Sequence, residues 1–544
     1  MNLNSRPKLS PVAVWLSVCV LLNCAGLILS ALGQLNRAGY AVVFALGGAA
    51  ACAWWLRCRP RLEAGFRWSR LRRRFRRGLP LGFAVLAGLA ILGGVLHGAS
   101  NYDGLTYRIP RVLHWLAEGR WHWIHTEFQR VNTRACGFEW LMAPLLVFTK
   151  TDRLVFLLNA VTFLLLPGMC YGVLHRLGVR RRVAAAWMWL LPTAYCFLLQ
   201  EGSISNDLFG AACALAAVYY ALRGRGQPGI GTASWALLAA ALMTGAKTSN
   251  LPLMLPCLLA GLPLWSAFLR RPAIAAPVLV AAALCSFLPM AVMNLRHSGD
   301  WSGLKAEGVS FNAGSPAVCL GNNAVLLVIQ NFVPPVFPLT KQWEGGATRL
   351  IPESFGRKIQ AAFEPGGAHW RLGKLQVEES AGLGLGVSLL LLLSFAAAQM
   401  HRSGNGRKPA WPLWRTVFYG GALIALGVFM AKSGLSTAAR LVAPYYLFLI
   451  PALLQAPVHT RIIRARVWRL GAGGVMLLSA LPLILSPARP LWPARTVLAH
   501  LDAARTHPSL ARFRMVYEVY GDRADGFAPV RELDRKSTRL NSSH

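Results

Sequence analysis

The chain has few charged residues for its length, and acidic residues are especially scarce. Of its 544 residues only 14% are charged, whereas 55% are hydrophobic, and the mean hydropathy is +0.43. A soluble protein of this size needs considerably more charged surface to remain in water. The scarcity of charge therefore excludes an ordinary soluble protein and indicates a chain that faces lipid.

Motifs that mark several other protein classes are also missing. The sequence has neither a P-loop nor a Rossmann fingerprint, so a soluble nucleotide substrate is not expected. No internal repeat or CxxC pair is evident, and most cysteines fall within apolar runs, where they pack as small hydrophobic residues. Cys136 and Cys319 fall in predicted external loops and could form a disulfide, a question that spacing alone leaves open.

Long apolar runs recur along the whole chain. Each is long enough to cross a hydrocarbon core of roughly 30 Å, and together they predict an all-α polytopic membrane protein with about thirteen spans. The predicted spans are approximately 11–33, 39–57, 79–98, 153–174, 183–200, 207–222, 232–246, 251–269, 272–294, 381–400, 411–431, 441–456 and 466–486. The first run is too long for a typical signal peptide, so an uncleaved span is expected. The shorter stretch 138–149 predicts a juxtamembrane or re-entrant helix.

The net charge of +36 is distributed over short loops between the apolar runs. Basic loops of membrane proteins lie on the cytoplasmic side, so the arginine-rich loop 57–77 sets the orientation. The basic loops near 176–182, 223–225, 270–271, 402–408 and 461–469 then fall on the same side. A nucleic-acid partner is not expected, because the basic residues do not share one soluble face. Anionic lipid head groups are the expected partner of these loops.

The predicted topology divides the chain into five parts. They are an N-terminal transmembrane module, 1–294, with an external loop at 99–152; an external loop or cap, 295–380; C-terminal transmembrane helices, 381–486; an external tail, 487–534; and the segment 535–544. That last segment is unlike the rest and resembles vector read-through, so it is excluded from functional inference. The two long loops lie on one face, where function is expected to concentrate.

Asp103 follows the third predicted span directly, in Asn101-Tyr-Asp-Gly-Leu-Thr-Tyr-Arg108. A carboxylate at the membrane surface is costly unless it is solvated or paired, so Asp103 is a functional candidate; a helix cap is the alternative. The apolar spacing after Ile109 predicts an amphipathic helix in the interface plane, with Arg111 on its polar face.

The same external loop contains His122, His125 and Glu127, which could bind a metal ion. An aromatic belt formed by Trp121 and Trp123, with solvated histidines, is the favoured interpretation.

Three further charged residues reach the same predicted side as Asp103, each at the end of a span. They are Asp207, Lys247 and Arg440. These residues could be independent side chains that extend to the interface. Alternatively, they could line one cavity with Asp103, where a carboxylate acts as a base and cations hold a phosphate.

These residues resemble motifs of the GT-C membrane glycosyltransferases, and most closely the glycosyltransferase-39-like group. That group includes protein O-mannosyltransferases, aminoarabinose transferases and lipopolysaccharide-core sugar transferases. The resemblance covers about residues 80–260, and the remainder only as a pattern of spans. The 101–107 segment is similar to the first-loop motif, whose aspartate is taken as the catalytic base. Many members have an acidic pair there, whereas Gly104 follows Asp103, so the second acid is absent or supplied by Glu139.

The other matches are shorter. Asn206-Asp207 is similar to an acidic position that opens a later span, and Lys247 in Gly-Ala-Lys-Thr to a basic position of related chains. Arg440, with Pro444, is similar to an Arg-x-x-x-Pro segment near the last spans.

The resemblance implies a GT-C fold and an inverting transfer of a sugar from a polyprenyl-phosphate donor. The acceptor would be a hydroxyl of a lipid, glycan or protein. The implied roles are Asp103 as general base, Glu139 and Asp207 as supporting acids, and Arg108, Lys247 and Arg440 as ligands of the donor phosphate. No cofactor is required, and a divalent metal is possible but not expected. Since no organelle signal is evident, a bacterial inner membrane with a periplasmic site is expected.

Three other functions are weighed against this one. A transporter or flippase of lipid-linked sugars predicts inverted repeats and broken helices with charges near mid-membrane. An unrelated glycan polymerase or ligase would also carry a large late external loop. A purely structural membrane protein leaves the one-sided set of charges unexplained. The position of the Asp103 motif favours the glycosyltransferase.

Overall fold

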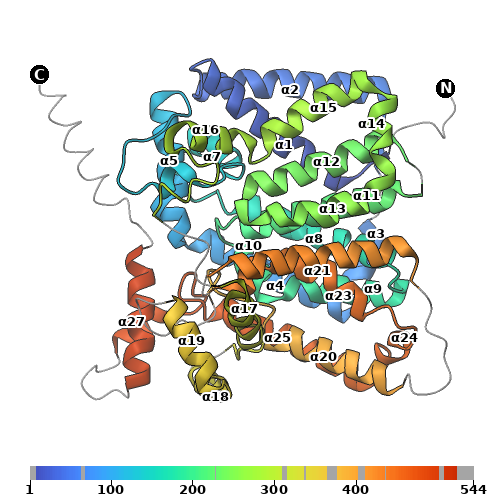
Figure 1. The fold of residues 1–544 in the computed structure, drawn as a ribbon, viewed down its shortest axis with the longest axis vertical. Helices are drawn as coiled ribbons and strands as arrows, with labels where there is room; N and C mark the ends of the chain where they lie inside the picture. The colour runs from blue at the N-terminus through green and yellow to red at the C-terminus, as the bar shows by residue number, and fades with distance from the viewer. Residues whose placement is uncertain are drawn as a thin grey trace, which may run out of the picture.

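The computed structural model describes residues 8–62, 68–226, 228–308, 315–335, 339–363, 377–401, 411–434, 437–500 and 508–523. These residues are predominantly helical (Figure 1). Their β-structure is one parallel pairing of two-residue strands, β1 (Lys8–Leu9) and β2 (Arg61–Leu62). The predicted all-α class is confirmed. The segment 535–544 and the basic residues within 402–408 lie outside the described residues.

Six helices in the described part of the chain are long and apolar enough to cross a bilayer without interruption. They are α1 (Pro11–Ala31), α2 (Arg37–Cys58), α4 (Gly78–Leu96), α8 (Leu157–Arg176), α21 (Leu413–Lys432) and α25 (Arg466–Ile484). Large apolar side chains on α2, such as Val42, Leu46 and Leu56, are exposed, as expected of a helix surface that contacts lipid.

Three more candidate spans are helix pairs bent at a short break, by 61°, 65° and 51° in chain order. In the first, α9 (Arg181–Leu190) and η3 (Leu191–Thr193) are followed by α10 (Tyr195–Glu201). In the second, η4 (Thr248–Leu253) and α13 (Met254–Ala260) are followed by η5 (Leu262–Leu264) and α14 (Ser266–Arg270). In the third, α15 (Pro272–Cys285) is followed by α16 (Leu288–Ser298). Each break lies close to a proline, namely Pro192, Pro263 or Pro289. Proline interrupts helical hydrogen bonding, which accounts for the bends.

The sequence predicts about thirteen spans. Each of them coincides with one of these nine candidates or with a further helix. The further helices are α11 (Asp207–Gly224), α12 (Ile230–Ala246), α20 (Leu385–Met400) and α23 (Ala443–Leu453). Three of them are shorter than a span normally requires, and α11 carries a charge near each end. By length and composition, the described residues therefore contain six to nine candidate spans, fewer than predicted.

The remaining helices are short. They are α3 (Trp68–Phe75), η2 (Gly104–Arg108), α5 (Ile109–Glu118), α6 (Arg130–Thr133), α7 (Glu139–Thr149), α17 (Pro316–Asn331), α18 (Leu339–Arg349), α19 (Glu353–Phe363), α22 (Ala438–Leu441), α24 (His459–Ile462), α26 (Ala494–Ala499) and α27 (Pro508–Arg523). In Figure 1 the arginine-rich α3 lies toward the right end of the bundle, whereas α5 and α27 lie toward the left. The basic α3 and the first-loop helix α5 thus occupy opposite ends, as the predicted topology requires.

The described part of the predicted cap, 295–380, contains α17, α18 and α19. Helix α17 packs along α21, and its Asn323 side-chain amide donates to the carbonyls of Met430 and Ser433, at 2.7 and 2.6 Å. The first part of the predicted cap is therefore attached to a span. The proposed division into domains stays a prediction.

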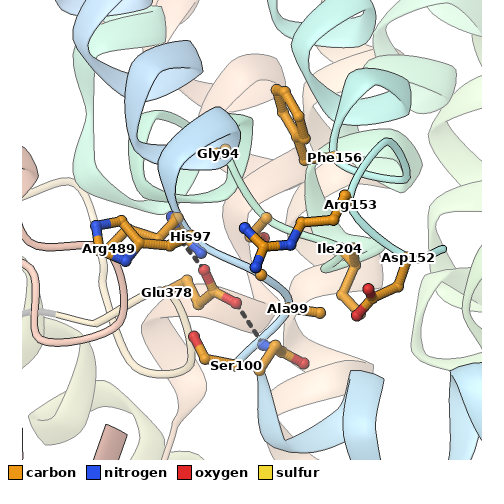
Figure 2. A pocket seen from close by; sticks show the side chains of 14 residues that line it. Gly94, His97, Ala99, Ser100, Asp152, Arg153, Phe156, Ile204, Glu378 and Arg489 are labelled. Carbon is orange, nitrogen blue, oxygen red and sulfur yellow. Dashed lines mark hydrogen bonds and ion pairs between the residues drawn. The ribbon is translucent and has the colours of Figure 1, made fainter. Parts of the chain in front are cut away.

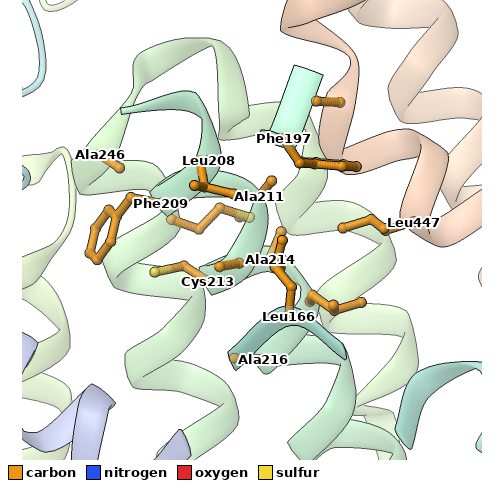
Figure 3. Packing of buried hydrophobic residues seen from close by; sticks show 14 of the residues in the cluster. Leu166, Phe197, Leu208, Phe209, Ala211, Cys213, Ala214, Ala216, Ala246 and Leu447 are labelled. Carbon is orange, nitrogen blue, oxygen red and sulfur yellow. The ribbon is translucent and has the colours of Figure 1, made fainter. Parts of the chain in front are cut away.

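Helix α11 forms the centre of the hydrophobic core. It packs against α12, α8, α13 and α23, and nearly all of its residues are buried. Leu208, Phe209 and Cys213 project from it among residues of neighbouring helices, such as Phe197 and Leu447 (Figure 3). The many alanines of α11 allow close approach of the surrounding helices, which is the usual way for membrane helices to pack. Because Asp207 begins this helix, its carboxylate is anchored to the most enclosed element of the fold.

Candidate functional site

Asp103 lies in the first external loop, where the chain turns from α4 into α5. Residues Gly104–Arg108 form a π-helical turn, η2, that continues directly into α5. Gly104 packs against Ile204, and a Cβ atom at position 104 would overlap the end of that side chain. An acidic residue directly after Asp103, as in many GT-C first-loop motifs, would therefore require Ile204 to move.

Asp103 is a mostly buried carboxylate surrounded by cations. Its side chain is 13% exposed, with Oδ2 3.6 Å from Arg108 Nη2 and Oδ1 3.9 Å from Arg130 Nη2. Burial raises the pKa of Asp103, but the charges of Arg108, Arg440, Lys247 and Arg130 together lower it by more. The pKa of Asp103 therefore lies below its ordinary range, and the carboxylate stays ionised.

Arg108 holds Asp103 from the protein side. Its guanidinium donates to the Ile204 carbonyl at 2.9 Å and to Asn206 Oδ1 at 2.7 Å. These bonds join η2 to the segment just before α11. Since the Arg108 side chain is almost fully buried, it supplies charge and position to Asp103 and does not face solvent.

Glu139, the predicted supporting acid, begins α7 and is fully buried behind Arg108. It forms an ion pair with Arg111, and its Oε1 lies 3.9 Å from Arg108 Nε. Arg111 also donates to the carbonyls of Arg134 and Ala135, at 2.7 and 2.9 Å. The expectation that Arg111 lies on the polar face of α5 is therefore wrong: Glu139 and two carbonyls satisfy it in the interior.

A second charged group forms around Asp207, the first residue of α11. Asp207 is ion-paired with Lys247, and its Oδ2 lies 3.4 Å from Arg440 Nε. Lys247 follows α12 directly and Arg440 lies in α22, so three distant segments meet at one carboxylate. Asn206 strengthens the junction, because its side-chain amide donates to the Ala246 carbonyl at 2.6 Å. Lys247 and Arg440 also act electrostatically on Asp103, so the predicted set forms one cluster.

Lys247 is a cation of this cluster whose charged form is disfavoured by burial. It lies between α12 and η4, outside the candidate spans. Burial lowers the pKa of Lys247 to about 8, although the neighbouring Asp207 opposes this shift. An anion bound beside its ammonium group would relieve that penalty.

Two glutamates that were not predicted as site residues, Glu378 and Glu379, hold the first external loop. Glu378 accepts from Asn101 Nδ2 at 2.7 Å and from Arg489 Nη2 at 2.5 Å, and Figure 2 shows Glu378 reaching toward Arg489. Glu379 accepts from the backbone N–H of Tyr102 at 2.7 Å. The sequence did contain a signal for these site residues. Two acids stand side by side just before an apolar run, in a chain with so few acids.

A pocket lies where the end of α4 and the start of the first external loop meet the residues just before α8 and the segment after α25 (Figure 2). His97, Arg153, Glu378 and Arg489 are among its lining residues. His97 Nε2 lies 2.9 Å from the Pro490 carbonyl oxygen, and Arg489 is paired with Glu378. Two of the charged groups of the pocket, Glu378 and Arg489, are thus engaged with each other.

The histidine-rich part of the first external loop does not form a recognisable metal site. Across the described residues, no three His, Cys, Asp or Glu side chains are grouped closely enough to hold a metal ion. Trp121 packs edge-on against Trp115 and Trp140, with ring centroids 6.3 and 6.0 Å apart. That transfer requires no metal stays a prediction. Cys136 is a buried free thiol, so it does not pair with Cys319.

Comparison with known proteins gives limited information about identity. No protein-family model matches the chain, and no match is found among curated proteins. Among solved structures, ArnT from Cupriavidus metallidurans, crystallised with undecaprenyl phosphate, is similar over 80% of this chain and 84% of that chain. The sequence identity is 14% and the TM-score is 0.34. A likeness of this extent assigns no family. The chain is an all-α polytopic membrane protein whose charged residues converge on Asp103 and Asp207.

Proposed function

We propose that the chain transfers a sugar from a polyprenyl-phosphate donor to a hydroxyl acceptor at the external membrane surface. The observation that carries this proposal is the single cluster formed by Asp103, Asp207, Lys247 and Arg440. The cluster lies at the ends of apolar helices. A substrate with a membrane-embedded tail and an anionic head group fits that position.

The charge balance of the cluster favours a phosphate. In the direct pairings, two carboxylates face four cations: Asp103 and Asp207 against Arg108, Arg130, Lys247 and Arg440. Glu139 is largely compensated by Arg111. The excess of cations attracts an anion, and the partly exposed Lys247 and Arg440 are accessible to one.

The arrangement fits an inverting displacement. The acceptor oxygen attacks the anomeric carbon of the donor sugar, and the bond from that carbon to the phosphate oxygen breaks, with its electron pair leaving on the phosphate. Asp103 accepts the proton of the attacking hydroxyl as the general base. Lys247 and Arg440 stabilise the negative charge of the leaving lipid phosphate. Glu139 and Asp207 position these three groups as supporting acids. Arg108, which the resemblance implied as a third ligand of the phosphate, is almost fully buried beside Asp103 and acts here as a positioning residue.

The direction of the site follows from the two ends of the bundle. The arginine-rich α3 lies at the end opposite to α5 (Figure 1). The positive-inside rule makes the α3 end cytoplasmic, so the Asp103 cluster faces outward. In a bacterial inner membrane this is the periplasmic side, where lipid-linked sugars replace soluble nucleotide sugars as donors.

A transporter of lipid-linked sugars is a second candidate, and the three bent helix pairs are the observation in its favour. Transporters use broken helices near mid-membrane to hold their substrates. Here, however, Asp103, Asp207, Lys247 and Arg440 lie at or beyond the ends of helices. The prolines in the breaks explain the bends without a binding role.

The direct test is transfer of label from polyprenyl-phosphate sugars to acceptors in membranes that contain the wild-type protein or Asp103→Asn at matched amounts. Glu118→Gln, on the exposed surface of α5, is the matched control. Transfer by wild type and Glu118→Gln, but not by Asp103→Asn, supports the proposal. Transmembrane movement of the lipid-linked sugar without any transfer would instead establish a transporter.

A further inference from the structure

Glu379 reaches the first external loop at the residue next to Asp103. Its Oε1 accepts the backbone N–H of Tyr102 at 2.7 Å, and its Oε2 lies 3.3 Å from the Tyr520 hydroxyl of α27. Glu379 is half-buried, in contrast to Glu378, which is buried between Asn101 and Arg489. The two adjacent glutamates therefore differ in access as well as in contacts.

Glu379 and Asp103 share a cation. The charge of Arg440 lowers the pKa of both carboxylates, so both lie within its electrostatic reach. Glu139 has a different position, since it is fully buried behind Arg108. Position 104 has little room for a second acid because of Ile204. Asp207 is already paired directly with Lys247 and Arg440. Glu379 is bonded instead to a backbone N–H and a tyrosine hydroxyl beside the first external loop.

The surroundings of Glu379 and Asp103 shift the pKa values of these two carboxylates in opposite directions. Burial raises the pKa of Glu379, and the charge of Glu378 raises it further. The Tyr102 N–H, Arg440 and Arg523 oppose this rise but do not cancel it. The pKa of Asp103, in contrast, is held below its usual range by four cations. A pair of carboxyl groups with divergent pKa values is the usual basis of divided proton-transfer roles.

We propose that Glu379 is the second carboxylate of the site and receives, by way of Asp103, the proton that the acceptor hydroxyl loses. This inference rests on the proposed sugar transfer. The acceptor O–H bond breaks as the new bond to the anomeric carbon forms, and the proton passes to Asp103. From there it moves to Glu379, directly or through water, and then to bulk solvent. The electron pair of the broken sugar–phosphate bond leaves with the lipid phosphate, and nothing is oxidised or reduced.

The pH dependence of kcat tests this role. The charged or titratable groups that influence the pKa of Glu379 or bond to its carboxylate are Glu378, Arg440, Tyr520 and Arg523. Wild-type kcat should fall at acidic pH as Glu379 becomes protonated before the reaction and can no longer accept a proton. Glu379→Gln should lower kcat by about 100-fold, leave KM nearly unchanged and abolish this acidic limb. Glu379→Asp should restore part of the rate and the limb.

Two further variants separate proton transfer from a purely structural role. Glu378→Gln should reduce the amount of folded protein, because it weakens the bonds to Asn101 and Arg489. It should keep the acidic limb but move it to lower pH, because the charge of Glu378 raises the pKa of Glu379. Tyr520→Phe removes a hydrogen bond that favours ionised Glu379. It should therefore raise the pKa of Glu379 and move the limb to higher pH without unfolding the protein.

The outcomes of these measurements are distinct. If wild type transfers sugar and Glu379→Gln keeps the wild-type pH profile, the role of Glu379 is wrong while the proposed function stands. A raised KM with an unchanged limb would mean that Glu379 only positions the loop. If folded wild type transfers no sugar from any donor to any acceptor, the proposed function fails and the inference fails with it.

Discussion

Arg440 Nε lies 3.4 Å from Asp207 Oδ2 and joins α22, in the C-terminal part of the chain, to the first residue of the central helix α11. Lys247 shares the same carboxylate. One buried anion therefore compensates two cations that come from separate segments of the chain. This arrangement makes Asp207 a structural requirement of the site, whatever reaction the site performs.

Replacement of Asp207 should destabilise the protein more than replacement of Asp103. Asp207→Asn leaves Lys247 and Arg440 mostly buried without their carboxylate, which should cost about 3 kcal/mol. Thermal unfolding in detergent, followed by fluorescence-detected size exclusion, measures the effect. Asp207→Asn combined with Lys247→Met should be more stable than Asp207→Asn alone. If the single and double variants unfold at the wild-type temperature, the pairing does not contribute to stability.

Asp103→Asn should abolish transfer without unfolding the protein. The substitution removes a proton acceptor, and loss of a general base lowers rates by about 10²–10⁴-fold. Asparagine has nearly the same shape as aspartate, and Arg108 keeps its bonds to the Ile204 carbonyl and Asn206 when the carboxylate is lost. The kcat of the purified variant, at a folded fraction equal to that of wild type, checks this expectation. A rate within about twofold of wild type would contradict the assignment of the base.

Binding of a phosphate lipid should weaken as the pH rises through about 8. The pKa of Lys247 is lowered to about 8, so this ammonium is charged below that pH and neutral above it. The affinity for undecaprenyl phosphate, measured by fluorescence or calorimetry, should fall over this range in wild type. Lys247→Met should bind weakly and without that dependence.

Stability of the ligand-free protein should change in the opposite direction. Since the folded pKa of Lys247 lies below its usual value of 10.5, the unfolded chain binds more protons between these two values. Stability from this group therefore rises with pH over that interval. Lys247→Met should remove this contribution, and an unchanged pH profile of unfolding in that variant would contradict the lowered pKa.

Introducing an acidic residue directly after Asp103 should destabilise the protein. In Gly104→Asp the new Cβ overlaps the Ile204 side chain, and such overpacking typically costs about 1–3 kcal/mol. Ile204→Ala in the same chain should recover part of this loss by making room. Unfolding temperatures of the single and double variants measure the effect. If Gly104→Asp alone is as stable as wild type, space at this position does not limit the motif.

The orientation can be tested with membrane-impermeant thiol reagents in a background without reactive native cysteines. Tyr102→Cys, at a position 46% exposed in the wild type, should react from outside in intact cells. Arg73→Cys, on α3, should react only after the membrane is permeabilised. Labelling with the reverse sidedness would place the Asp103 cluster in the cytoplasm.

Local patterns in the sequence predicted the membrane class and the positions of most helices. Because long apolar runs are stable in lipid as helices, the predicted ranges coincide with helices or bent pairs. The same topology placed Asp103, Asp207, Lys247 and Arg440 on one side, and the structure gathers them into one cluster. Their catalytic roles stay predictions.

Contacts between distant segments could not be predicted in the same way. The burial of Arg111 depends on Glu139, which belongs to another helix. The bond from the Tyr102 N–H to Glu379 depends on how the end of a long loop returns to the bundle. The described residues also contain fewer candidate spans than predicted. Three predicted spans are bent near prolines, and four others are helices that are short or carry a charge near each end.

The anchoring of the first external loop has a consequence for biogenesis. Asn101 and Tyr102 are held by Glu378 and Glu379, which are bonded in turn to Arg489 and Tyr520. The ribosome makes Asp103 long before any of these partners, so the nascent chain carries an unanchored loop through most of its membrane insertion. The anchored form of this loop can therefore assemble only after translation has passed Arg489 and Tyr520.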